Sequence, residues 1–194
     1  MKDLINNLKK EIVTLSNKPT FIHHSWFVKY HLEIVEKIAL ELCEKYPHAD
    51  KNLVLILVWM HDYGKIVDYD HQYEATLTKG KEKLIEFGFS TEMTKKIIAY
   101  IKLFDAKENL SAAPIEIQIV SSADGASHFV GPFYHIFWKE FNKWSDGELI
   151  AENLRKAKVD WKKKVVLPEI KEAFNKRFQF VIESFGTLPE KYLE

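Results

Sequence analysis

Apolar residues recur every three or four positions along most of the chain, which is the period of an amphipathic α-helix. Four stretches show the pattern clearly, and charged residues fill the positions between. Each stretch therefore predicts a helix with one buried face. The four apolar stripes are Leu4, Leu8, Ile12 and Leu15; Val28, His31, Val35, Ile38 and Leu42; Ile150, Leu154, Ala157, Trp161 and Val165; and Ile170, Phe174, Phe178, Val181 and Phe185.

End signals accompany two of these stripes. Asp146 precedes the third stripe and is expected to cap the N-terminus of that helix. Pro168 suits the first position of the last helix, because its missing N–H would have no partner there. Gly186 follows the last apolar position and is expected to end the helix.

Two segments are ambiguous by periodicity alone. Residues 53–60 are apolar throughout, so they suit a buried strand or a buried helix. Residues 115–119 alternate between apolar and polar, which taken alone favours a strand. Pro114 can start a helix, however, and a helix would place Ile117, Val120, Asp124 and His128 on one face. Because every unambiguous element is helical, both segments are predicted to be helices.

Composition supports one all-α domain, a helical bundle over residues 1–194. The chain has 194 residues, of which 46% are hydrophobic, with only 7 glycines and 6 prolines. The longest apolar run has eight residues, Leu53 to Met60, whereas a membrane span needs about 20. Charges interrupt the N-terminal segment, which argues against a signal peptide. Cys43 is the single cysteine, so we expect a soluble, cytoplasmic protein in a reducing compartment.

The charge balance argues against a dedicated nucleic-acid partner. Lysine plus arginine number 28 and aspartate plus glutamate number 28, so the formal net charge is 28 − 28 = 0. Residues 155–177 hold nine basic and three acidic residues, a local excess of 9 − 3 = +6. That excess could attract an anionic substrate, but we interpret it as a solvated face of two amphipathic helices.

The most informative residues are His61 and Asp62, which directly follow the most hydrophobic segment. A carboxylate buried there is costly unless a cation or strong hydrogen bonds compensate its charge. A metal ion would do so, and histidine and aspartate are suitable ligands for Mn, Fe, Co, Ni or Zn. Further ligands must come from elsewhere in the chain. His31 and Asp124 lie on otherwise apolar faces, although singly each also suits a structural role, as a core histidine and a cap or turn residue.

As a set, these residues resemble the HD-domain superfamily of metal-dependent phosphohydrolases, whose pattern is a histidine, a His-Asp pair and a distant aspartate. The matching segments are KYH31LEIVEKIALEL, VWMH61D62YGK65 and SSAD124GASHF, with His71 and Gly88 fitting the helix between them. The resemblance covers about residues 24–130 and leaves residues 131–194 as C-terminal helices. It implies an all-helical fold and a metal held by His31, His61, Asp62 and Asp124.

Departures from the family pattern narrow the expected chemistry. Two-metal members carry further histidines after the His-Asp pair, where this chain has Lys102. We therefore expect one divalent transition metal. Some nucleotide-handling members carry carboxylates just after the pair, where this chain has Lys65 and Ile66.

The resulting hypothesis is a phosphohydrolase that acts on a small phosphate ester, with a nucleotide as the first guess. Asp62 and Lys65 are its predicted catalytic residues, although Lys65 equally suits a solvated lysine after a helix end. Predicted substrate-binding residues are Lys65, His71, Lys102 and His128, and His128 equally suits a structural role. The proton donor to the leaving oxygen stays open among Asp68, Asp70, His71, Glu74 and Lys102.

A rival hypothesis is an HD-type sensor or binding module that holds metal without turnover. Seven aromatic residues between positions 129 and 144 could stack a nucleobase, but we interpret them as packing residues; they are Phe129, Phe133, Tyr134, Phe137, Trp138, Phe141 and Trp144. The sequence predicts no membrane partner, and a homodimer is compatible with it.

Overall fold

Helices make up the fold, and no strand occurs within residues 1–137 and 144–186, which the computed structural model describes. The all-α prediction is therefore confirmed, and both ambiguous segments are helical. The helices are α1 (Lys2–Ser16), α2 (Glu33–Lys45), α3 (Lys51–Met60), α4 (Tyr63–Val67), α5 (Gln72–Glu86), α6 (Thr91–Ala106), α7 (Ile115–Ser127), α8 (Phe133–Ile136), α9 (Asp146–Val159) and α10 (Pro168–Phe185). A π-helical turn, Val28–Leu32, leads into α2, and a second one, Asp160–Lys164, follows α9.

The helix ends follow local chemistry. Asp50 accepts hydrogen bonds from the first turn of α3, and Ser90 does the same for α6. The predicted cap at Asp146 is wrong: Ser145 caps α9, and Glu148 completes a reciprocal capping box. Asp146 is instead the first helical residue, because the serine hydroxyl one position earlier already accepts from the free N–H group of Glu148.

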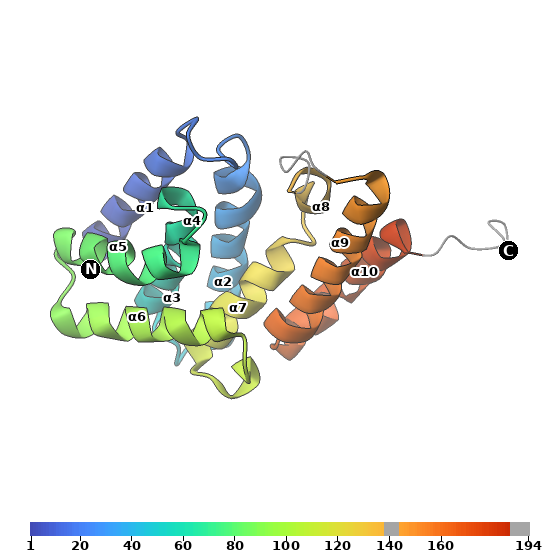
Figure 1. Ribbon diagram of the computed structural model, residues 1–194. Coiled ribbons are helices and arrows are strands. Elements are labelled where there is room, and N and C mark those ends of the chain that lie inside the picture. Colours follow the sequence, from blue (N-terminus) through green and yellow to red (C-terminus); the bar gives the residue numbers. More distant parts are fainter. Residues whose placement is uncertain (138–143, 187–194) are drawn as a thin grey trace, which may run out of the picture.

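Two central helices, α3 and α7, are buried on nearly all sides, and this explains their ambiguous sequence patterns. In Figure 1, α7 crosses between α2 and the C-terminal pair of helices. It contacts α2, α3, α6, α10 and both π-helical turns. The buried Ser121 hydroxyl donates a hydrogen bond to the Lys164 carbonyl, and Ser122 accepts two from the backbone at Val166 and Leu167. Polar side chains on α7 therefore fix the segment that joins α9 to α10.

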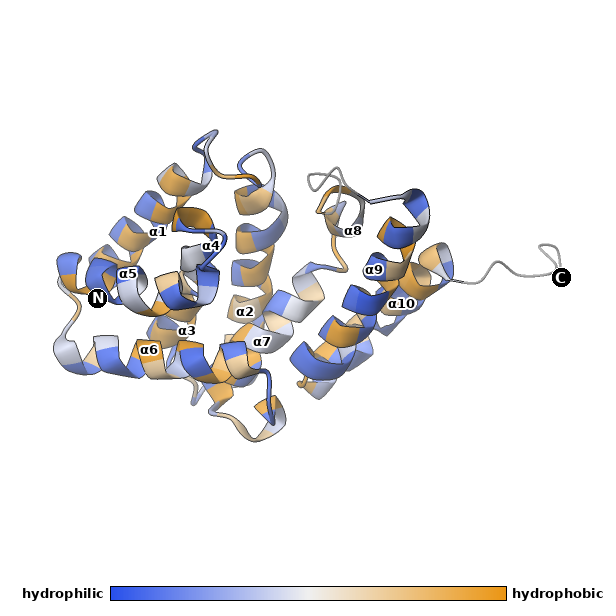
Figure 2. Cartoon of the chain, in the orientation of Figure 1, coloured by the Kyte–Doolittle hydropathy of each residue, from blue (hydrophilic) through white to orange (hydrophobic). Residues whose placement is uncertain are grey.

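The C-terminal pair, α9 and α10, lies beyond α7 (Figure 1), and α10 and the turn after α9 pack against α7. Figure 2 shows that most of α9 is hydrophilic. The predicted apolar stripe of α9 is wrong at Ile150, whose exposed fraction is 44%. The buried face carries Asn153, Ala157 and Asp160 instead, because this side of α9 faces a polar centre beside α7. Pro168 starts α10, and Gly186 follows its last residue, as predicted.

One cluster of buried apolar residues extends from α1 to α10. No helix in the described ranges combines the length and apolarity that a membrane crossing requires.

Candidate metal centre

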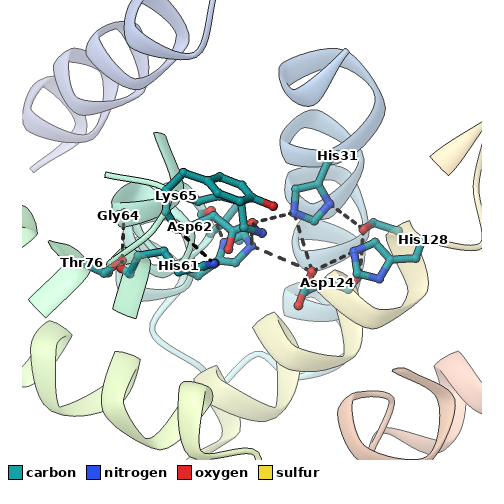
Figure 3. A network of polar contacts seen from close by, with 12 residues as sticks. His31, His61, Asp62, Gly64, Lys65, Thr76, Asp124 and His128 are labelled. Carbon is teal, nitrogen blue, oxygen red and sulfur yellow. Dashed lines mark hydrogen bonds and ion pairs between the residues drawn. The ribbon is translucent and has the colours of Figure 1, made fainter. Parts of the chain in front are cut away.

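Three separate parts of the chain bring polar side chains to one buried point. His31 comes from the π-helical turn before α2, and His61 and Asp62 follow α3. Asp124 lies near the end of α7, with His128 one turn later. Figure 3 shows these side chains facing one another across the gap between the helices. The structure thus brings together all four residues of the predicted metal set.

The distances place nitrogen and oxygen donors around a common centre. Nε2 of His31 lies 3.4 Å from Oδ2 of Asp62 and 3.7 Å from Oδ1 of Asp124. Nε2 of His61 lies 3.6 Å and 3.9 Å from the same two oxygens. Nε2 of His128 lies 3.5 Å from Oδ1 of Asp124. Two overlapping triads could hold an ion, namely His31, His61 and Asp62, and His31, Asp124 and His128.

Hydrogen bonds at the far side of each ring decide which nitrogen carries the proton. The His61 Nδ1–H donates to the Val58 carbonyl at 2.8 Å, since a carbonyl can only accept. The Ser127 hydroxyl donates to the Asp124 carbonyl, so its oxygen accepts from His31 Nδ1 at 3.1 Å. The carboxylate of Asp160 accepts from His128 Nδ1 at 2.7 Å. In the neutral rings, all three Nε2 atoms therefore present lone pairs to the centre.

Lone pairs and carboxylates that face one another repel unless a cation lies between them. Nε2 of His61 is buried and has no hydrogen-bond partner among the described residues. Such an atom is costly to bury without a partner. Ligating histidines typically bond their second nitrogen to a carbonyl or carboxylate, as these do. The residues present therefore fit a divalent transition metal.

Electrostatics favours the protonation states that bind metal. Burial lowers the pKa of His31, and burial followed by the charge of Lys156 lowers the pKa of His128 to about 3. Burial alone would raise the pKa of Asp62 and Asp124, but the charges of Lys65 and Lys164 respectively hold both pKa values well below the usual range. At neutral pH the centre thus offers neutral imidazoles at His31 and His128 and ionised carboxylates at Asp62 and Asp124.

Comparison with known protein families matches residues 28–127 to the HD domain. This segment covers more than half of the chain and contains all four predicted ligands. The chain belongs to the HD-domain family. No similar protein was found among curated proteins, and no similar solved structure was found. His128 lies one residue beyond the HD-domain match, and α9 and α10 lie wholly outside it.

Beside the candidate metal centre of this HD domain lies a cleft of about 210 Å³. Its wall is rich in cationic and aromatic side chains. The lysines are Lys65, Lys107, Lys156 and Lys164, and the aromatic residues are Trp26, Phe27, Tyr69, Tyr73, Phe104, Phe133 and Phe137. Of the predicted substrate-binding residues, Lys65 and His128 line the cleft. The ammonium group of Lys65 lies 2.7 Å from Oδ2 of Asp62.

The structure does not place the other two predicted substrate-binding residues at the cleft. His71 precedes α5, its side chain is 71% exposed, and it pairs with Asp68 at 3.1 Å. Lys102 is exposed because its neighbours Ile101 and Phe104 take the inward positions on α6. Neither residue lines the cleft. The positions of His71 and Lys102 therefore do not support a substrate-binding role for either residue.

Sequence reasoning missed three functional candidates on and just after α9. Lys156, Asp160 and Lys164 recur at four-residue intervals and pack towards the centre. Lys164 Nζ lies 2.6 Å from Oδ2 of Asp124, and Asp160 is only 1% exposed. The interpretation of this basic stretch as a solvated face is therefore wrong at these positions. The sequence signal that could have identified these residues is the spacing, because Asp160 lies four residues from each of the two lysines.

Asp105, at the end of α6, is a further candidate that the sequence did not single out. It lines the cleft, and it makes no hydrogen bond or ion pair within the described part of the chain. Burial, and then the negative charge of Asp62, raise the pKa of Asp105 to about 6. It is therefore a cleft carboxyl that can hold a proton near neutral pH.

The described aromatic residues after α7 include packing residues, as predicted, and some of them also line the cleft. Phe133 is buried and stacks on the His128 ring with centroids 3.9 Å apart. Phe129 packs against Trp161 and Phe178 in the C-terminal pair. Trp138 and Phe141 lie outside the described residues.

Proposed function

We propose that this HD-domain protein is a metal-dependent phosphohydrolase that acts on a small phosphate ester, with a nucleotide as the first class to test. The observation that carries the proposal is the convergence of imidazole lone pairs and carboxylates beside a lysine-lined cleft. A cation supplied to that centre would be held by His31, His61, Asp62 and Asp124. Membership of a family of metal-dependent hydrolases supports the same conclusion.

A bound divalent ion would supply a Lewis acid that polarises the phosphorus–oxygen bond and acidifies a water molecule. Asp62 and Asp124 provide the negative charge that such an ion requires. Each of these carboxylates also forms an ion pair with a lysine: Lys65 pairs with Asp62, and Lys164 pairs with Asp124. These ion pairs keep both carboxylates ionised and oriented before the ion binds.

Substrate phosphate would be bound by lysines on two sides of the cleft. Lys65 Nζ has three N–H donors, of which one points to Asp62, so the others are available to phosphate oxygens. Lys156 approaches from α9 and contacts Asp160 with Nζ–Oδ2 at 3.2 Å. Burial, its largest influence, lowers the pKa of Lys156 to about 8, so the ammonium form still dominates at neutral pH.

The leaving oxygen needs a proton, and Asp105 is the cleft carboxyl best suited to hold it. Among the donors considered from sequence, none of Asp68, Asp70, His71, Glu74 and Lys102 lines the cleft. Asp105 does, and no ion pair from the described residues occupies its carboxyl group. A protonated carboxyl group with a pKa near 6 is a competent general acid close to neutral pH.

The test is phosphate release by chelator-treated protein reloaded with Mn²⁺, Fe²⁺, Co²⁺, Ni²⁺ or Zn²⁺. The substrates are p-nitrophenyl phosphate and a panel of nucleoside mono-, di- and triphosphates. We expect metal-dependent hydrolysis that a chelator removes and that Asp62→Asn nearly abolishes. Asp3→Asn, an exposed aspartate in the first turn of α1, is the matched control and should keep full activity.

Folded, metal-loaded protein that releases no phosphate from any of these esters would contradict the phosphohydrolase and favour the non-catalytic binding module. Activity that is unchanged in Asp62→Asn would contradict the assigned site. The proposal takes a small molecule as the partner of this site. We also infer a cytoplasmic location from the single, buried cysteine, Cys43.

A further inference from the structure

His128 has the same relation to the buried centre as the two histidines of the HD-domain motif. Its Nδ1 is bonded on the far side of the ring, and its Nε2 faces Oδ1 of Asp124 at 3.5 Å. We propose that His128 is a fifth protein ligand of the ion, an inference that rests on the metal site of the proposed function. We propose further that Asp160 is the residue that positions it.

Three contacts hold the His128 ring in one orientation. Asp160 Oδ2 accepts from Nδ1 at 2.7 Å, and Phe133 stacks against the ring with an interplanar angle of 24°. The His31 ring lies nearly parallel, with centroids 5.3 Å apart and an interplanar angle of 19°. A ring stacked on one face, flanked by a second ring and bonded at one nitrogen is restricted to presenting its remaining nitrogen in one direction. That direction is towards the centre, as Figure 3 shows for His128, His31 and Asp124.

A purely structural hydrogen bond from His128 to Asp124 does not fit this arrangement. A neutral imidazole carries one ring proton, and the carboxylate of Asp160 holds it at Nδ1. Nε2 therefore meets Asp124 as a lone pair meeting a carboxylate oxygen, which is repulsive without a cation between them. His31, Asp124 and His128 place their ligand atoms within 4.8 Å of one another, close enough to share one ion.

The surroundings of Asp160 suit a residue that orients the His128 ring. It is 1% exposed, and its charge is balanced by Lys156 at 3.2 Å and Lys164 at 3.7 Å, while the Tyr134 hydroxyl donates to it at 3.4 Å. A carboxylate behind a ligating imidazole fixes its tautomer and raises its basicity. The turn after α9 would then orient His128, the one ligand of the site that lies outside residues 28–127.

A third imidazole also narrows the class of metal. Oxygen-rich sites suit Mg²⁺, Ca²⁺ and Mn²⁺, whereas imidazole favours Zn²⁺, Co²⁺, Ni²⁺ and Fe²⁺. Three nitrogen and two oxygen donors therefore direct the site to the second group.

The first test counts the histidine ligands directly in Co²⁺-loaded wild-type protein by proton NMR in H₂O. Each coordinated imidazole contributes one strongly shifted N–H signal that disappears in D₂O, and all three Nδ1–H groups are protected by hydrogen bonds. We expect three such signals. Two signals, from His31 and His61 alone, would overturn the inference and would leave the proposed function unaffected.

The second test uses His128→Phe, which keeps a ring against Phe133 but removes the donor nitrogen. Chelator competition should show that Co²⁺ binding to the folded variant is at least about tenfold weaker, and Asp160→Asn should weaken it by a similar factor. His48→Phe, at an exposed histidine between α2 and α3, is the matched control and should bind as the wild type does. Unchanged affinity in folded His128→Phe would overturn the inference.

The outcomes of these tests separate the two proposals. Three N–H signals without phosphate release would retain His128 as a ligand and reject the hydrolase. Failure of the wild type to bind Co²⁺ would reject both. If His128→Phe does not fold, the signal count in the wild type decides the matter alone.

Discussion

The ammonium group of Lys164 lies 2.6 Å from Oδ2 of Asp124, although 40 residues separate them. Both side chains are buried, and burial alone would lower the pKa of Lys164, but the charges of Asp124 and Asp160 raise this pKa above its usual value. Lys164 therefore takes the place of an external cation at one oxygen of Asp124. It keeps the terminal aspartate of the motif ionised and leaves the other oxygen, Oδ1, towards the histidines.

Lys164→Met should destabilise the metal-free protein strongly, because it leaves Asp124 as a buried charge without its nearest cation. We expect a loss of about 3 kcal/mol or more in the free energy of unfolding with chelator present. Added Co²⁺ should recover part of this loss, because the ion replaces the missing charge and binds only the folded state. Thermal melts with chelator and with Co²⁺ measure both effects.

The control for this substitution is Lys163→Met, which removes an exposed neighbouring lysine. Its stability should stay within about 0.5 kcal/mol of the wild type. Equal melting temperatures of the two variants in chelator would show that the contact with Asp124 contributes nothing to folding.

The role of Lys164 also shows where sequence reasoning reaches its limit. His31 and Asp124 could be found from sequence because each is a polar residue on an apolar helical face, and the His61–Asp62 pair because it ends an apolar run. Lys156 and Lys164 lie in a stretch where charged residues are common. A buried lysine in such a stretch has the same local pattern as a solvated one. Only the packing of the turn after α9 against α7 distinguishes them.

The same packing explains the error in the apolar stripe of α9. Helical periodicity predicts an apolar buried face, and this assumption holds for α2, whose face meets the core. The inward face of α9 meets a charged centre instead, so Asp160 is buried while Ile150 is exposed. Periodicity also gives no sign of the π-helical turn that carries His31. Such turns frequently occur at functional sites.

Gly64 should tolerate no side chain, because α4 packs closely against α5 there. Its N–H donates to the Thr76 hydroxyl at 2.8 Å, and an added Cβ would collide with the Gln72 carbonyl oxygen and lie 2.5 Å from Thr76 Oγ1. We expect Gly64→Ala to cost about 3 kcal/mol or more of stability in urea unfolding. Gly147→Ala, in the first turn of α9 with no atom within 4 Å of the new Cβ, should add about 0.5–1 kcal/mol. Similar effects of the two substitutions would show that the close approach of α4 and α5 is not required.

Asp105 should make the stability of the metal-free protein fall between about pH 4 and 6. Its pKa is raised to about 6 in the folded state, so folding favours the protonated carboxyl group. The stabilisation is complete below the unfolded pKa of about 4 and is lost as the pH rises through 6. Asp105→Asn stays neutral and avoids this loss. We expect it to match the wild type at pH 4 and to be more stable by about 2–3 kcal/mol at pH 8. Parallel pH-dependent melts of the two proteins would contradict the raised pKa.

Asp105→Asn should impair hydrolysis according to the leaving group of the substrate. A general acid matters most when the departing oxygen is strongly basic, as in an alkyl or nucleoside phosphate, and little when it is p-nitrophenolate. We expect kcat to fall by about 10²–10⁴ on the first kind of ester and only slightly on p-nitrophenyl phosphate. Wild-type kcat on a nucleoside monophosphate should decline as the pH rises through the pKa of Asp105, whereas the variant should lack this limb. Co²⁺ affinity must remain unchanged in Asp105→Asn, which separates proton donation from damage to the metal centre. An equal loss on both kinds of ester would instead assign Asp105 to substrate binding, since binding does not distinguish leaving groups by their basicity.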